Sequence, residues 1–179
     1  KETGEMEFLD VKFAYVQVGP KLCILDKMTL AMEDLSSPLR KQRLPPTGWA
    51  DWNDCLNPRD KNSESVFNAM LFCTACRALE DLLVELQRPR DAALWARRSR
   101  QVAEAIDRNA WDGGWYRRMF LADTGRILGS RRSRGWGKIF LEPQVWAALC
   151  RALDPDKTRK AMDSARRKLG TRFGLRLLD

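Results

Sequence analysis

The sequence contains no histidine, so the side chain that most often binds transition metals in proteins is missing. Its five cysteines include one closely spaced pair, Cys73-x-x-Cys76, and no second pair stands elsewhere to complete a tetrahedral zinc site. The pair also falls in a strongly helical run, where small buried thiols are common. We therefore predict no metal ion, and packing roles for both thiols.

Long apolar runs are also missing. No stretch approaches the roughly 20 apolar residues that a membrane-spanning helix needs, and no basic-then-apolar leader opens the chain, which starts at Lys1. The odd number of scattered cysteines offers no disulfide framework and indicates reduced thiols. We expect an internal segment of a cytoplasmic protein with no membrane partner, and the 44% hydrophobic and 31% charged content is ordinary for a globular chain.

The formal net charge of +8 is compatible with a nucleic-acid partner. Basic residues concentrate in three runs, Arg97–Arg100, Arg131–Arg134 and Arg166–Lys168. The first and third alternate with the apolar faces of predicted helices, as solvated surfaces do, and no nucleic-acid-binding module is recognisable. Binding to nucleic acid is therefore kept only as an alternative, and we expect none.

Hydrophobic periodicity predicts helices over residues 21–35, 64–87 and 91–108, after a loop or short strand pair in residues 1–20. Ser63 is the expected N-cap of the second helix. Its expected buried stripe consists of Phe67, Leu71, Ala75, Ala78, Leu82 and Leu86. The buried face of the third is expected to hold Leu94, Val102, Ala105 and Ile106. Because a tight turn separates the second and third helices, we expect them to pack antiparallel.

Glycines interrupt the aromatic residues between Asn109 and Leu141, which predicts turns and a short hairpin on the rim of a cleft. Helix signals resume at Pro143 and again at Asp154-Pro155, where the aspartate can cap and the proline can occupy the first turn. Gly170 and Gly174 are expected to end the last helix. Periodicity thus predicts a mostly α fold with functional loops.

Residues 36–62 form a long predicted loop, and loops of this length in compact domains are usually functional or disordered. We call its most unusual part, Trp49–Asn57, the signature segment, because it packs two tryptophans, two carboxylates and two carboxamides into nine residues. Neighbouring prolines and Gly48 disfavour a helix there. In an extended chain, Trp52 and Asp54 would point one way and Asp51 and Asn53 the other.

An aromatic plate beside a carboxyl group suits sugar chemistry. The indole can cover the apolar face of a pyranose while the acid reaches the glycosidic oxygen, and an apolar wall together with a nearby carboxylate would raise the pKa of that acid. The alternative is a structural loop whose tryptophan fills a core and whose Asp and Asn side chains cap helices. Spacing alone does not decide between the two.

The stretch Ala50-Asp51-Trp52-Asn53-Asp54-Cys55-Leu56-Asn57 resembles the signature of the cellobiose phosphorylase family, the inverting disaccharide phosphorylases of glycoside hydrolase family 94. Further segments resemble the family in the family's order: Glu64–Ala69, Trp111-Asp112-Gly113 with Trp115-Tyr116 and Arg118, Gly129-Ser130, Gly137–Gln144, and Ala161–Ser164 with Leu169–Thr171. An ordered series is far more specific than one motif. The resemblance covers most of this chain but a minority of a complete family member.

The resemblance implies a partial (α/α)6 barrel, a helical toroid with long functional loops. Residues 1–179 would be a fragment of a single α/α-barrel catalytic domain, with the N-terminal β-sandwich and the C-terminal part of the barrel outside it. We expect the interior faces of several helices to be exposed unless other chain segments cover them.

The activity that the resemblance implies is phosphorolysis of a β-linked disaccharide such as cellobiose, with inorganic phosphate as co-substrate and no cofactor. Asp54 matches the general acid, and Trp52 is expected to line the subsite of the transferred sugar. Asp51 and Asn53 are expected to hold the loop or to hydrogen-bond the acid. Cys55 is expected either to border the acceptor sugar or to have only a packing role. Cysteine rather than glycine at this position of the family signature favours the cellobiose and cellodextrin branch over laminaribiose and chitobiose phosphorylases or cyclic β-1,2-glucan synthases.

Other family-like residues carry weaker expectations. Trp115, Tyr116 and Arg118 would either contact the cleft or brace its rim. Glu142 and Gln144 lie in a family-like segment, but capping explains a glutamate before proline at a helix start better than substrate contact does.

The sequence also departs from the family. Family members bind phosphate partly through a histidine that this chain lacks, and Gly114 replaces the acidic residue usual after the Trp-Asp-Gly trio. We therefore expect this polypeptide alone to be inactive or nearly so, within a protein that is a phosphorylase and commonly a homodimer. The alternative is a degenerate helical module that binds carbohydrate or a protein partner without turnover.

Overall fold

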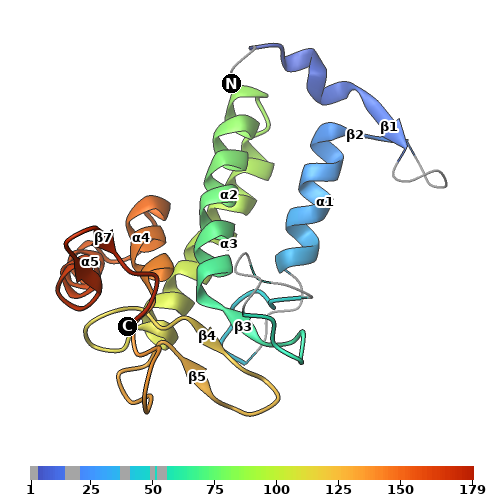
Figure 1. Cartoon of the computed structure of the whole chain (residues 1–179). Helices are drawn as coiled ribbons and strands as arrows, with labels where there is room; N and C mark the ends of the chain where they lie inside the picture. Colours follow the sequence, from blue (N-terminus) through green and yellow to red (C-terminus); the bar gives the residue numbers. More distant parts are fainter. Residues whose placement is uncertain (1–3, 15–20, 37–40, 49–50, 52–55) are drawn as a thin grey trace. The chain divides into compact units, whose positions relative to one another are not determined.

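The computed structural model describes residues 4–14, 21–36, 41–48, 51 and 56–179, and its contacts divide the chain into two compact units, Lys1–Pro38 and Leu39–Asp179 (Figure 1). In the first unit, a 3-10 turn η1 (Met6–Asp10) precedes an antiparallel pair of strands, β1 (Lys12–Ala14) and β2 (Lys21–Cys23). Helix α1 (Ile24–Ser36) follows directly. Of the loop or strand pair expected within residues 1–20, a strand pair is present, but its second strand lies at residues 21–23. The predicted helix is confirmed, and it begins three residues late because residues 21–23 join that strand pair.

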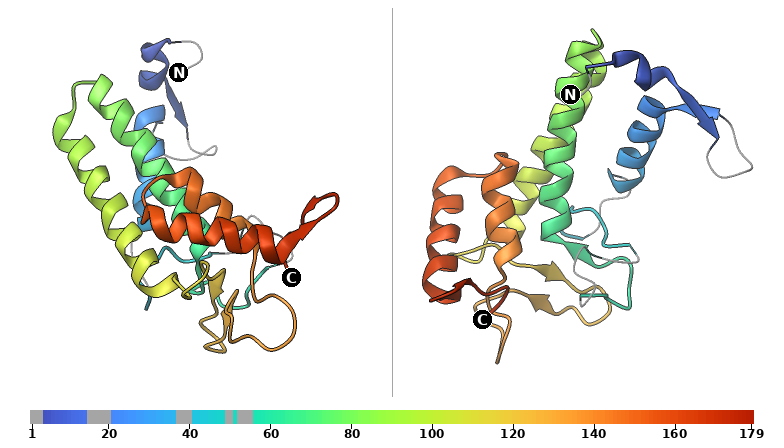
Figure 2. Two further views of the ribbon diagram at one scale, coloured as in Figure 1. Left: turned by 90° about the vertical axis from the view of Figure 1, so that its left-hand side faces the viewer. Right: turned by 45° about the horizontal axis from the view of Figure 1, so that its top comes forward.

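In the second unit, the core is a helical hairpin of α2 (Val66–Glu85) and α3 (Pro89–Ala105), side by side in both views of Figure 2. One π-helical turn, η2 (Ile106–Ala110), continues α3. The expected helical pair is confirmed. Val102 and Ala105 on α3 and Ile106 at the start of η2 are buried as predicted. Leu94 is half-buried, and the largest side chain of α3 that faces the core is Trp95.

The buried face of α2 differs from the predicted one. Of the predicted stripe only Phe67 is buried, while Leu71 and Leu82 are half-buried and Ala78 is exposed. The buried residues are Val66, Phe67, Ala69, Met70, Phe72, Cys73, Cys76, Leu79 and Leu83. The prediction was wrong because α2 carries apolar residues on more than one face, so periodicity allows several stripes and packing against α3 selects among them.

The start of α2 is also shifted relative to the prediction. Ser65, not Ser63, is the N-cap, and its hydroxyl oxygen accepts a hydrogen bond of 3.1 Å from the backbone amide of Asn68. Glu64 and Ser65 form strand β3, which lies at one edge of a three-stranded antiparallel sheet with β4 (Met119–Phe120) and β5 (Ile127–Leu128). The short hairpin expected between residues 109 and 141 is confirmed as β4–β5.

Two further helices complete the second unit. Helix α4 (Leu141–Cys150) begins two residues before Pro143, and α5 (Pro155–Leu169) begins where predicted. Asp154 caps α5, since its carboxylate accepts from the amides of Asp156 and Lys157 at 2.9 Å each. The predicted end of α5 at Gly170 is confirmed, and there a small strand pair follows, β6 (Gly170–Thr171) with β7 (Gly174–Leu175).

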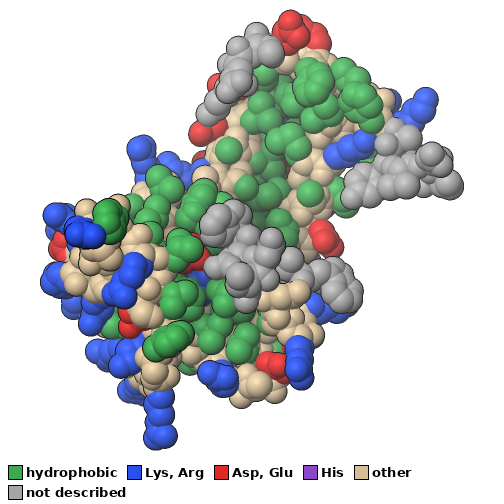
Figure 3. Space-filling view, viewed as in Figure 1, with side chains coloured by type: hydrophobic (Ala, Val, Ile, Leu, Met, Phe, Trp, Pro, Cys, Tyr) green, Lys and Arg blue, Asp and Glu red, His purple; other side chains and the backbone are tan. Residues whose placement is uncertain are grey.

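The described part of the chain is mostly α-helical, with small antiparallel strand pairs between the helices. None of its helices is long and apolar enough to cross a lipid bilayer. Figure 3 shows exposed Lys and Arg side chains on the second unit. In the last turn of α5, Arg166, Arg167 and Lys168 are exposed.

Candidate functional site

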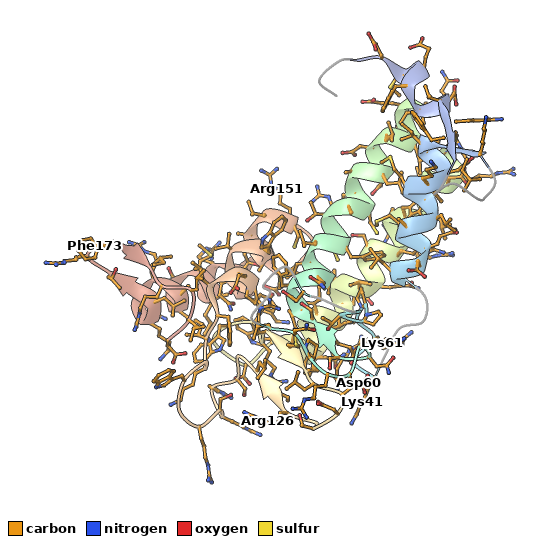
Figure 4. All side chains as sticks on the ribbon, turned by 45° about the vertical axis from the view of Figure 1, so that its right-hand side comes forward. Lys41, Asp60, Lys61, Arg126, Arg151 and Phe173 are labelled. Carbon is orange, nitrogen blue, oxygen red and sulfur yellow. The ribbon has the colours of Figure 1, made fainter. Side chains whose placement is uncertain are left out.

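The loop that carries the signature segment is closed at its base by hydrogen bonds. The amide of Thr47 donates to the carbonyl of Ser63 at 2.6 Å, and the amide of Gly48 donates to the carbonyl of Lys61 at 3.1 Å. Pro46 and Glu64 form an isolated antiparallel bridge in the same place. The two ends of the loop, at Gly48 and Lys61, are therefore held together beside β3, and Figure 4 labels Asp60 and Lys61.

Six residues of the signature segment lie outside the described part of the chain: Trp49 and Ala50, and the run Trp52, Asn53, Asp54 and Cys55. Asp51, immediately before that run, is described, and it is buried with 4% of its surface exposed. The predictions for Trp52, Asn53, Asp54 and Cys55 therefore stay predictions. The structure instead reports how the chain is held just before them.

Asp51 forms a buried ion pair with Arg118, and neither side chain has any exposed surface. One guanidinium nitrogen, Nη1, donates to Asp51 Oδ2 at 2.9 Å, and the other, Nη2, donates to Oδ1. The hydroxyl of Ser65 donates to Asp51 Oδ2 at 2.6 Å and accepts from Arg118 Nη1 at 3.0 Å. A carboxylate held this way, away from solvent, is suited to fixing a loop rather than to exchanging a proton with a substrate.

Arg118 is itself fixed through its backbone. Its amide donates to the carbonyl of Leu128 at 2.8 Å, and its carbonyl accepts from the amide of Val66 at 3.1 Å. Gly129 permits this close approach: a Cβ atom there would lie 2.6 Å from the Arg118 amide nitrogen, and its φ of +76° is a conformation that favours glycine. The guanidinium also lies 5.3 Å from the ring centroid of Phe67.

The aromatic segment before Arg118 is tied by hydrogen bonds to the segment of residues 129–138 that follows β5. The indole N–H of Trp115 donates to the carbonyls of Gly129 and Lys138 at 3.0 and 2.8 Å. Asp112 is buried and accepts from Arg117 Nη2 at 2.8 Å and from the amide of Arg131 at 2.6 Å. Of the two roles left open for Trp115 and Arg118, these contacts favour the bracing one. The Trp115 indole N–H binds two backbone carbonyls, and Arg118 Nη1 and Nη2 bind Asp51 and Ser65.

Gln144 and Tyr116 link the aromatic segment before Arg118 to α4 and to η2. The fully buried amide of Gln144 accepts from the Tyr116 amide at 2.8 Å and donates to the Tyr116 carbonyl at 2.9 Å. The Tyr116 hydroxyl donates to Asp107 Oδ1 at 2.7 Å. Burial, together with that hydrogen bond to a carboxylate, raises the pKa of Tyr116 above its usual range. The structural role favoured for Gln144 agrees with these contacts.

Two pockets flank this region of the second unit. An apolar pocket of about 370 Å³ lies between α2 and α4, and its lining includes Phe67, Trp146 and the buried Glu142. Phe67 and Trp146 meet edge to face, with centroids 5.7 Å apart. A second, more polar pocket of about 410 Å³ is bounded by the base of the signature loop at Gln42 and Asn62 and by the β4–β5 hairpin.

The four free cysteines in the described residues include Cys73 and Cys76 on α2. Burial raises the pKa of the Cys76 thiol to about 12, and it raises that of Cys73 further. Among the described residues, no three Cys, Asp or Glu side chains gather as metal ligands would.

Sequence reasoning assigned no role in this site to Ser65 or Gly129, although both lie in family-like segments. Ser65 could have been found, because it stands immediately before the first apolar residue of α2, which is where an N-cap is expected. Gly129 was noticed only as part of a family-like pair. Its close contact with Arg118 depends on two strands meeting in space, and local sequence patterns do not predict such a contact.

A model of the glycosyl hydrolase 94 superfamily catalytic domain matches residues 1–179. The chain is 28% identical over 99% of its length to a 3-O-β-D-glucopyranosyl-β-D-glucuronide phosphorylase of Paenibacillus borealis, and it covers 23% of that protein. It is 30% identical over 99% of its length to an N,N'-diacetylchitobiose phosphorylase of Vibrio furnissii, with 22% of that protein covered. It is also 27% identical over 97% of its length to a solabiose phosphorylase of P. borealis, with 23% covered.

The chain thus spans less than a quarter of the length of these curated relatives. The family resemblance of the signature segment and of the ordered segments after it is confirmed by this match along the whole chain. The chain belongs to the glycosyl hydrolase 94 superfamily and corresponds to part of its catalytic domain.

Proposed function

We propose that this chain is part of an inverting phosphorylase, which cleaves a β-linked glucose disaccharide with inorganic phosphate and releases α-glucose 1-phosphate. The observation that carries the proposal is a signature loop, closed at its base and anchored at Asp51, in a chain that matches the family along its whole length. No cofactor enters this proposal.

In the proposed reaction, Asp54 is the general acid. Its carboxyl proton passes to the glycosidic oxygen as the bond between that oxygen and the anomeric carbon breaks. A phosphate oxygen attacks the same carbon from the opposite face, so a β-linkage gives an α-phosphate. Phosphate is already anionic and needs orientation rather than a general base.

The other signature residues take supporting roles in this proposal. Trp52 covers the apolar face of the transferred glucose, Asn53 holds the loop or hydrogen-bonds the acid, and Cys55 borders the acceptor sugar. Cys55 in the place of glycine is the reason to propose cellobiose or a cellodextrin as the substrate. The relatives above are named for other disaccharides, so the acceptor must be found with a panel of β-linked disaccharides.

We also propose a partial (α/α)6 barrel for the helices of this chain, within a homodimeric cytoplasmic enzyme. The half-buried apolar residues of α2, such as Leu71 and Leu82, fit helices whose remaining face is covered by other chain segments. The free thiols of Cys23, Cys73, Cys76 and Cys150 support a reducing compartment.

The test is the variant Asp54→Asn, made in the polypeptide expressed from the complete reading frame. Loss of the transferable proton should lower phosphate-dependent release of glucose 1-phosphate by about 10²–10⁴-fold, which is the usual contribution of a general acid. The matched control Asp81→Asn, at an exposed position of α2, should leave the rate unchanged. Unchanged turnover in Asp54→Asn, or wild-type turnover that needs no phosphate, would refute the proposal.

A further inference from the structure

We propose that Arg118 and Asp51 are positioning residues, whose buried ion pair presents the general acid Asp54 in the geometry that proton transfer requires. The inference deepens the proposed function and rests on it, because it needs Asp54 to be the acid. It goes beyond the family resemblance, which left open whether Arg118 contacts the cleft or braces its rim.

The geometry of the pair fixes an orientation and not only a distance. Arg118 donates from both Nη1 and Nη2 to the two carboxylate oxygens of Asp51, and such paired hydrogen bonds hold the planes of the two groups together. The Ser65 hydroxyl adds a third donor at 2.6 Å. Because both charged side chains are wholly buried, water does not compete for these bonds.

The Asp51–Arg118 ion pair holds a residue within the signature loop, whereas the backbone hydrogen bonds hold only the base of the loop. Asp54 follows Asp51 by three positions, and three residues of backbone reach at most about 11 Å in any conformation. Holding Asp51 therefore limits where Asp54 can be placed. The hydrogen bonds at Thr47 and Gly48 fix only the entrance of the loop.

The pair joins three segments that are distant in the sequence. Asp51 belongs to the signature loop, Ser65 caps α2, and Arg118 is held by its backbone between the start of α2 and β5. Any shift of the hairpin or of the helix start is thus passed to the residue that precedes Trp52. A positioning device needs this connection to rigid elements.

Net stability is a weak reason for the pair to exist. A buried ion pair seldom stabilises a fold more than apolar side chains of similar volume would, because both charges lose their hydration. Among the described residues, Arg118 Nε is also a buried donor without a hydrogen-bond acceptor, which adds to the cost. Geometric precision next to the signature is a better reason for keeping both charges.

The experiment compares Asp51→Asn, Arg118→Gln and the double variant in the full-length protein, with Tm, kcat and KM measured for each. Each single variant leaves one buried charge without its partner and should lower both Tm and kcat. The double variant removes both charges, so Tm should recover toward the wild-type value. Its kcat should stay about 10²-fold low, the cost of a misplacement near 1 Å, while KM changes little.

A merely structural pair gives the opposite result, since kcat in the double variant would then recover together with Tm. That outcome would overturn the inference. Arg118→Lys is a second route if the double variant does not fold, because lysine keeps the charge but not the two-pronged geometry. A folded Arg118→Lys protein with reduced kcat supports the inference, and one with wild-type kcat overturns it.

The exposed pair Arg88–Asp91 serves as a matched control, because its closest atoms are 2.8 Å apart, near the 2.9 Å between Arg118 Nη1 and Asp51 Oδ2, but its side chains are 50% and 46% exposed. The variant Arg88→Gln/Asp91→Asn should keep the wild-type kcat. Asp54→Asn and the wild type are assayed alongside. An inactive wild type would overturn the proposed function and this inference together, whereas an active wild type, an inactive Asp54→Asn and a fully active double variant would overturn the inference alone.

Discussion

Asp51 and Asp112 both stand next to a tryptophan in family-like segments, and the fold uses both as buried acceptors. Asp51 binds the Arg118 guanidinium, and Asp112 binds the Arg117 side chain and the amide of Arg131. Neither carboxylate faces solvent. These contacts leave Asp54 as the acid of the signature segment that the proposed mechanism can use.

The role of Asp51 as a residue that holds the loop could be anticipated from its sequence, but its partners could not. Ser65 is 14 residues away and Arg118 is 67 residues away. Hydrophobic periodicity and capping rules act over a few residues, so they carry no information about a pairing at that distance. Only the meeting of β3 with β4 brings the three side chains together.

The Cys76 thiol allows a prediction about alkaline pH. Burial raises its pKa from the usual 9.0 to about 12 in the folded chain, so the folded state keeps a proton that the unfolded state loses. The stability tied to this thiol is therefore complete below pH 9 and is lost as the pH rises toward about 12. Between pH 8 and pH 11, the Tm measured by thermal unfolding should fall less in Cys76→Ala than in the wild type. Identical declines would contradict the buried, protonated thiol.

At the scale of elements, helix positions were predicted well and helix faces less well. Local signals at Asp154-Pro155 and Gly170 located α5, because caps and prolines act on their own turn. The face of α2 was mispredicted, because its buried residues Cys73 and Cys76 are selected by contact with α3. The hairpin β4–β5 was expected as a hairpin, but its pairing with β3 was not.

The hairpin also allows a matched pair of glycine substitutions. Gly125 and Gly129 both have positive φ, +65° and +76°, so an alanine at either position carries a strain of about 1–2 kcal/mol. A Cβ atom at Gly125 would meet nothing within 4 Å, whereas one at Gly129 would lie 2.6 Å from the Arg118 amide nitrogen. Gly129→Ala should therefore destabilise the protein clearly more than Gly125→Ala in urea unfolding, and it should also lower kcat. Equal effects of the two substitutions would argue against the close contact with Arg118.

At the scale of the whole molecule, the mostly α composition and the family were both predictable from sequence. Composition and periodicity were enough for the first, while the second needed the ordered series of segments, since no single motif decides a family. The (α/α)6 barrel stays a proposal. Closure of a toroid depends on more helices than the described residues contain.

The 179-residue chain by itself should show no phosphorolysis, because an acid without an oriented phosphate supplies only part of the lowering of the barrier. The polypeptide from the complete reading frame, assayed with the same disaccharides, should be active. Release of glucose 1-phosphate by the purified 179-residue chain would contradict the prediction that residues outside this chain orient the phosphate.

The most direct test of the central proposal is the configuration of the product. The full-length protein is incubated with cellobiose and inorganic phosphate, and the first sugar phosphate formed is followed by proton and phosphorus NMR. Inverting phosphorolysis predicts α-glucose 1-phosphate together with an equal amount of glucose, and it predicts that both form about 10²–10⁴-fold more slowly in the Asp54→Asn variant. Formation of β-glucose 1-phosphate, or of two glucose molecules without sugar phosphate, would contradict the proposed mechanism.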